Sequence, residues 1–68
     1  MITKEQLELI DFRTKDGTLY HDYYRFDFEY NIKSQDLYEF NEVNGKTKYL
    51  CPVIDIDQLK ELTEYYIK

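Results

Sequence analysis

Hydrophobic and polar residues alternate in the second half of the stretch from Leu19 to Tyr30, which reads LYHDYYRFDFEY. Successive side chains of a β-strand leave opposite faces of the sheet, so a period of two predicts a strand. We therefore expect one long strand over about residues 18–32, with the charged residues 25, 27 and 29 in solvent. Its opposite, buried face would carry the aromatic side chains of Tyr24, Phe26, Phe28 and Tyr30.

A second alternating segment, residues 36–43, has Tyr38 and Phe40 on one face and is followed by Asn44-Gly45. Asn-Gly between two alternating segments is a strong signal for a two-residue hairpin turn. Residues 46–51 are then the returning strand, which Pro52 ends because proline has no N–H to donate.

The two-residue turn also predicts a register. It places Phe40 opposite Tyr49 and Tyr38 opposite Cys51, so the hydrophobic side chains coincide on one face. The preceding strand would continue this layer by pairing Tyr30 with Tyr38 and Phe28 with Phe40. The same register puts Glu29 opposite Glu39, which is an unfavourable pair of like charges.

The segment before the long strand leaves two readings open. If Lys15-Asp16-Gly17 forms a three-residue hairpin loop, Phe12 faces Tyr20 on the core side. If Asp16-Gly17 forms a two-residue turn, Phe12 points away from the core. We favour the first reading, and the sequence does not decide whether residues 11–15 form a strand.

A short helix is predicted at each end of the sequence. Over residues 2–10, Thr3 and Gln6 form a capping box, Ile2 and Leu7 a hydrophobic staple, and Leu7 with Ile10 an apolar stripe. The second helix starts at the cap Asp55, with Gln58 completing the box and Ile54 and Leu59 forming the staple. Its apolar stripe consists of Ile56, Leu59, Leu62 and Tyr66.

Together these elements predict one α+β domain over residues 1–68. It has two layers: an N-terminal helix, a three- to four-stranded antiparallel meander and a C-terminal helix, with both helices on one face of the sheet. A chain of 68 residues buries a modest core. The single cysteine cannot form an intrachain disulfide, so large aromatic side chains or self-association must stabilise the fold.

Charge and hydropathy narrow the possible partners. The formal net charge is −5, which disfavours direct binding of nucleic acid or of an anionic membrane. The sequence has no apolar run long enough to span a bilayer, and its charged start does not resemble a secretory signal. With one cysteine, these features indicate the reducing cytoplasm.

The residues with catalytic or ligand-binding chemistry lack suitable neighbours. His21 and Asp22 are adjacent in a predicted strand and would point to opposite faces, so Asp22 cannot easily orient His21. Cys51 is expected to be a small buried hydrophobic residue. Asp55 and Asp57 are explained by helix capping and the helix dipole. We therefore expect no catalytic residue, no metal site and no cofactor.

Tyrosine is the one residue type in clear excess, with eight in the chain. Eight are too many for so small a core, and tyrosine is enriched at protein interfaces. The expected contact residues are those on the open face of the sheet, and Tyr65 near the C-terminus. The residues predicted on the sheet face are Tyr23, Arg25, Asp27, Glu29 and Glu39.

The opening MITKEQLELIDF, the Tyr/Phe/Asp/Glu strand and the closing IDQLKELTEYYIK resemble small accessory proteins of phages and prophages. Some proteins of this kind inhibit host enzymes or antiphage defence by occupying a partner's surface. The resemblance implies a non-enzymatic inhibitory protein that binds a protein partner, and the net charge of −5 favours a basic surface on that partner. The alternatives are a structural homodimer and a small-ligand or nucleotide binder that uses tyrosine stacking.

Overall fold

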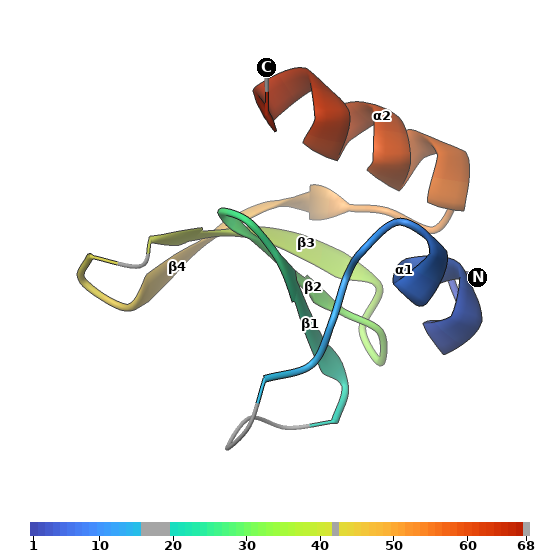
Figure 1. Cartoon of the computed structure of the whole chain (residues 1–68), viewed down its shortest axis with the longest axis horizontal. Coiled ribbons are helices and arrows are strands. Elements are labelled where there is room, and N and C mark those ends of the chain that lie inside the picture. The colour runs from blue at the N-terminus through green and yellow to red at the C-terminus, as the bar shows by residue number, and fades with distance from the viewer. Residues whose placement is uncertain (16–19, 42, 68) are drawn as a thin grey trace.

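The computed structural model describes residues 1–15, 20–41 and 43–67, and side chains as far as residue 64. Its elements are α1 (Lys4–Leu9), β1 (Asp22–Arg25), β2 (Phe28–Asn31), β3 (Asp36–Asn41), β4 (Lys46–Pro52) and α2 (Ile56–Ile67). The four strands form one antiparallel sheet in the order β1-β2-β3-β4. This confirms the predicted α+β fold of helix, meander and helix. The hairpin of β3 and β4 extends away from both helices (Figure 1).

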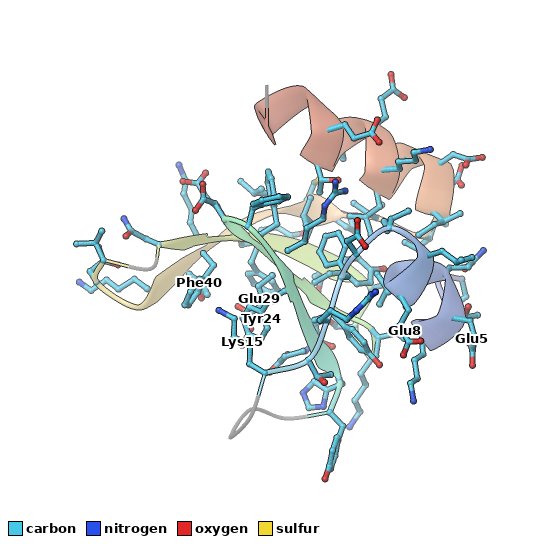
Figure 2. The ribbon with its side chains drawn as sticks, in the orientation of Figure 1. Glu5, Glu8, Lys15, Tyr24, Glu29 and Phe40 are labelled. Carbon is cyan, nitrogen blue, oxygen red and sulfur yellow. The ribbon has the colours of Figure 1, made fainter. Side chains whose placement is uncertain are left out.

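Helix α1 has the predicted start. The Thr3 hydroxyl accepts a hydrogen bond from the Gln6 N–H at 3.3 Å, and the Gln6 side chain accepts one from the Thr3 N–H at 2.9 Å. The reciprocal bonds satisfy two of the N–H groups that a helix leaves unpaired at its start. Leu7 points into the core, whereas Glu5 and Glu8 are exposed (Figure 2).

Helix α2 keeps the predicted cap at Asp55, but among the described residues Gln58 makes no hydrogen bond back to Asp55, so the predicted capping box does not form. The Asp55 carboxylate accepts a hydrogen bond from the Asp57 N–H at 3.0 Å, as a capping residue does. Ile54, however, is 67 % exposed, so it forms no hydrophobic staple with the buried Leu59. Leu59 is joined in the core by Thr63, a polar residue whose hydroxyl is satisfied by donating to the Leu59 carbonyl at 2.9 Å. The side chain of Tyr66 lies outside the described part of α2.

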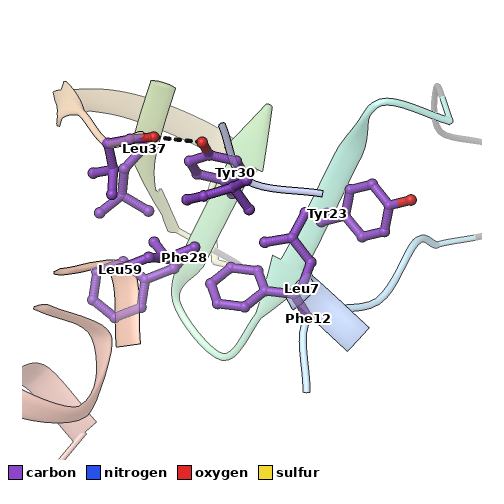
Figure 3. Close-up of a cluster of buried hydrophobic side chains, with 9 residues drawn as sticks. Leu7, Phe12, Tyr23, Phe28, Tyr30, Leu37 and Leu59 are labelled. Atoms are coloured by element: carbon purple, nitrogen blue, oxygen red, sulfur yellow. Dashed lines mark hydrogen bonds between the residues drawn. The ribbon is translucent and has the colours of Figure 1, made fainter. Parts of the chain in front are cut away.

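One hydrophobic core lies between the helices and one face of the sheet, which we call the inner face (Figure 3). The sheet contributes Tyr23, Phe28, Tyr30 and Leu37, and the rest of the chain contributes Ile2, Leu7, Phe12, Val53 and Leu59. The buried Tyr30 hydroxyl donates a hydrogen bond to the Val53 carbonyl at 2.5 Å, so its polar end is satisfied.

The predicted long strand is wrong, because the chain turns back in the middle of it. Arg25 pairs with Phe28, and Phe26 and Asp27 form the two-residue turn between β1 and β2. Phe26 has a φ of 51°, a left-handed conformation that is rare for a bulky residue. This turn places Tyr24 on the opposite face from Phe28 and Tyr30, and it leaves Phe26 62 % exposed.

The predicted registers of β3 are also wrong. Tyr30 pairs with Leu37 and Phe28 with Glu39, each one residue earlier along β3 than expected. Because side chains alternate, a shift of one residue exchanges the two faces of a strand. Leu37 therefore enters the core, whereas Tyr38 and Phe40 lie on the other face. Glu29 pairs with Tyr38, so the expected Glu29–Glu39 pair does not form.

The turn between β3 and β4 is longer than two residues. Asn41 pairs with Lys46, and Phe40 with Thr47 rather than Tyr49. The Asn41 side chain accepts a hydrogen bond from the Val43 N–H at 2.9 Å, and Gly45 has a φ of 68°, which glycine adopts without steric cost. An irregularity at Leu37/Tyr38 then gives the pairs Tyr38–Tyr49 and Leu37–Cys51, where Tyr38–Cys51 was predicted. The two-residue turn also predicts Glu42 opposite Thr47, but residue 42 lies outside the described residues.

Residues 11–15 do not form a strand. They contribute one isolated bridge, in which the Arg13 and Tyr24 backbones exchange hydrogen bonds of 2.9 and 2.7 Å. Phe12 is buried, as the favoured reading required, but the expected pairing with Tyr20 is wrong because Tyr20 is 91 % exposed. The loop proposed at Lys15-Asp16-Gly17 extends beyond the described residues.

Candidate functional site

The face of the sheet opposite the core carries a band of aromatic and acidic side chains. We call it the outer face, and the alternation of each strand assigns its members. In the described residues neither helix contributes to it. Its residues are Asp22, Tyr24, Glu29, Asn31, Asp36, Tyr38, Phe40, Thr47 and Tyr49.

The central row of the outer face crosses all four strands as Tyr24, Glu29, Tyr38 and Tyr49. The Glu29 carboxylate accepts a hydrogen bond of 3.0 Å from the Tyr24 hydroxyl. On the far side of Glu29, the Tyr38 and Tyr49 rings meet edge to face, with centroids 5.7 Å apart. The Glu29 carboxylate thus belongs to a position between Tyr24 and the Tyr38–Tyr49 pair.

Tyr24 and Phe40 form a first aromatic group, which already holds a cation. The Tyr24 and Phe40 rings meet edge to face at 5.6 Å, and the Lys15 ammonium lies 4.6 Å from the Tyr24 centroid and 4.8 Å from the Phe40 centroid. These distances fall within the range of a cation–π interaction. Figure 2 shows Lys15 reaching toward Tyr24 and Glu29 from the segment beside β1.

Two further carboxylates belong to the outer face. Asp22 accepts a hydrogen bond from the Asn31 side chain at 3.2 Å, and Asp36 pairs with Asn31 across β2 and β3. Partial desolvation of the Tyr49 hydroxyl raises its pKa, and the Asp36 carboxylate raises it further. The outer face is therefore negatively charged around its aromatic band.

Burial, the hydrogen bond to Glu29 and the nearby carboxylates raise the pKa of Tyr24 from 10.0 to about 12. Above pH 10 an unfolded tyrosine loses its proton while Tyr24 in the folded chain keeps it. The folded state then binds more protons than the unfolded state, so the free energy of unfolding falls as pH rises from 10 to about 12.

We expect Tyr24→Phe to lose less stability than the parent chain between pH 9 and pH 11, measured by guanidinium unfolding. The raised pKa of Tyr30 affects both proteins, so the difference between their stability losses isolates the contribution of Tyr24. Equal losses in the two proteins would show that the Tyr24 hydroxyl is not held protonated by folding.

The predicted contact residues do not share one face, and of those predicted there only Glu29 is on the outer face. Tyr23 is 5 % exposed and belongs to the core, and Arg25 lies half-buried on the inner face. Glu39 is also on the inner face, paired with Phe28 and Lys48, although it is exposed. Asp27 is exposed in the β1–β2 turn.

Tyr65 lies in α2, where its side chain is outside the described residues. The prediction missed Lys15 and most of the outer face, namely Asp22, Tyr24, Asp36, Tyr38, Phe40 and Tyr49. No sequence signal marks the turn at Phe26, and the faces of β1 and β3 depend on that turn and on a register shift.

A hollow of about 480 Å³ lies between α1 and the start of β1. The Arg13 guanidinium in it donates to the carbonyls of Glu8 at 2.7 Å and Phe12 at 3.0 Å. Arg13 therefore ties the end of α1 to the following segment. The hollow is lined by Lys4, Glu8, Arg13, Thr14, Tyr20 and Tyr23.

The described side chains include no group of three or more His, Cys, Asp or Glu residues placed to hold a metal ion. His21 Nε2 lies 3.8 Å from Asp22 Oδ1, which is longer than a hydrogen bond. Across the described part of the chain, no helix has the length and apolar character needed to cross a bilayer.

No protein-family model, curated protein or solved structure matches this chain. We therefore infer its function from the placement of its own side chains.

Proposed function

We propose that this chain is a non-enzymatic binding protein that uses the outer face of its sheet to hold a protein partner. The observation that supports this most directly is the aromatic band itself, in which Tyr49 is 53 % exposed and Tyr38 and Phe40 are partly exposed. Large aromatic side chains are enriched in the centres of protein interfaces and contribute much of their binding energy.

An inhibitory role in the cytoplasm of a bacterial host, encoded by a phage or mobile element, fits the resemblance of the sequence to small phage accessory proteins. Such an inhibitor acts by covering a surface of its target, which needs an accessible binding face and no catalytic groups. The free Cys51 fits a reducing compartment.

A homodimer through the same face is less favourable. Two copies placed face to face would bring the carboxylates of Asp22, Glu29 and Asp36 toward the same groups of the other copy. Like charges brought together in an interface cost free energy. We therefore expect a monomer at high micromolar concentration in size-exclusion chromatography with light scattering.

The proposed face can be tested by replacing Tyr49 with the photo-crosslinking residue p-benzoylphenylalanine and irradiating the protein in a bacterial lysate. The matched control carries the same residue at Leu9, which is 84 % exposed on α1. We expect position 49, and not position 9, to crosslink one protein, and excess unlabelled parent chain to compete this product away.

Two results would contradict the proposal. Equal crosslinking from positions 49 and 9 would show that the outer face has no special affinity. A product consisting of two copies of this chain would identify the face as a dimer interface instead.

A further inference from the structure

The outer face contains two aromatic groups of similar geometry, and Glu29 bonds to Tyr24 of the first and pairs with Tyr38 of the second. The Tyr24–Phe40 rings cross at 70° with centroids 5.6 Å apart, and the Tyr38–Tyr49 rings cross at 67° at 5.7 Å. In the first group the Lys15 ammonium lies over both rings, within 4.8 Å of each centroid. The chain therefore shows with its own lysine that this arrangement receives a cation.

The second group, Tyr38 and Tyr49, is accessible to a cation from another molecule. It lies on β3 and the edge strand β4, and Tyr49 keeps 53 % of its surface exposed. Tyr38 has Glu29 as its register partner on β2, and Asp36 stands two residues before it on the same face. A cation over the Tyr38–Tyr49 rings would thus lie on aromatic side chains, with the acidic residues Glu29 and Asp36 at neighbouring positions of the same face.

The overall charge favours the same kind of occupant. The chain carries a net charge of −5, and the outer face contributes the carboxylates of Asp22, Glu29 and Asp36 to it. A basic segment is attracted to such a surface and is guided toward it during association, whereas nucleic acid is repelled.

We propose that the Tyr38–Tyr49 pair receives a lysine or arginine side chain from a basic segment of the protein partner, as the Tyr24–Phe40 pair receives Lys15. This inference rests on the proposed function and adds the chemistry of the partner to it. The carboxylates of Glu29 and Asp36 supply the charge that selects a cation, and the two rings supply the surface on which its apolar stem and charged end lie.

The test uses a synthetic peptide, Ac-Gly-Arg-Gly-Arg-Gly-Arg-NH2, and a control peptide in which citrulline replaces each arginine. Citrulline keeps the shape of arginine without its charge. Binding is followed by NMR titration of the isotope-labelled chain, which also verifies that each variant is folded. We expect the arginine peptide to shift the amides around Tyr38 and Tyr49, and the citrulline peptide to leave them unchanged.

Variants separate the aromatic pair from general attraction to an acidic protein. Tyr49→Leu keeps the net charge and should weaken binding about five- to thirty-fold, which corresponds to one desolvated cation–π contact. Tyr49→Phe keeps the ring and should bind within about two-fold of the parent chain. Tyr20→Leu alters a tyrosine that is 91 % exposed outside the pair and should leave the affinity unchanged.

The proposal is overturned if Tyr49→Leu binds as tightly as the parent chain, if Tyr20→Leu loses as much affinity, or if the citrulline peptide binds equally well. Tighter binding of a single-stranded thymidine oligonucleotide than of the arginine peptide would also overturn it. A partner captured by crosslinking at position 49 without any response to the basic peptide would leave the proposed function standing and remove this inference alone.

Discussion

Leu7→Ala is expected to lower the free energy of unfolding by about 3 to 5 kcal/mol. Leu7 is fully buried against the sheet, and α1 is too short to hold itself together without that contact. A single-core domain of this length has a stability of about 3 to 5 kcal/mol, so the variant should be largely unfolded. Guanidinium unfolding followed by circular dichroism measures the effect.

The same helix supplies a matched control. Leu9→Ala makes the identical substitution two residues later, where the side chain is 84 % exposed, and should change the stability by less than about 0.5 kcal/mol. Leu7→Met keeps the core volume and should cost less than about 1.5 kcal/mol, so that a transition remains measurable. Equal losses for Leu7→Ala and Leu9→Ala would show that α1 does not pack on the sheet as described.

Gln35→Met is expected to cost about 2 to 4 kcal/mol, because it leaves buried backbone groups without partners. The Gln35 side chain accepts a hydrogen bond from the Ile2 N–H at 2.8 Å and donates to the carbonyls of Ile2 at 3.2 Å and Ile32 at 2.6 Å. Methionine has a similar shape but can replace none of these bonds. Gln35 is 7 % exposed, so water cannot easily take its place.

Two measurements separate this effect from a general loss of packing. The Ile2 amide should exchange with solvent faster in Gln35→Met, relative to amides of β2 and β3, because its acceptor is gone. Gln58→Met replaces an exposed glutamine of α2 and should be neutral within about 0.5 kcal/mol. Unchanged protection of the Ile2 amide would show that Gln35 does not hold the start of the chain.

The start of α1, the cap of α2 and the overall topology could be predicted because their signals are local. The Thr3–Gln6 capping box depends on residues three positions apart, and it forms as expected. Asn44-Gly45 correctly indicated a turn between two strands. The order of helix, strands and helix follows from such signals, without knowledge of which residues face each other.

The residues on each face of the sheet were not predictable in the same way, because a shift of one residue in the pairing register of a strand exchanges its two faces. Tyr38 and Phe40 form an aromatic face, whereas Leu37 shares its face with Glu39, so alternation alone indicates the wrong set as buried. Tertiary contacts decide the matter: Leu37 pairs with Tyr30, whose hydroxyl reaches the Val53 carbonyl before α2. The candidate site was missed because it consists of aromatic residues that were assigned to the core.

The two-residue turn at Phe26 and Asp27 makes the length of the chain critical at this point. Deleting one residue there would slide β1 by one position along β2, which would bury Tyr24 and expel Tyr23. A single deletion would thus damage the core and the proposed binding face together. By contrast, an insertion beside Val43, which is 97 % exposed at the tip of the other hairpin, should be tolerated and offers the natural place for a label or tag.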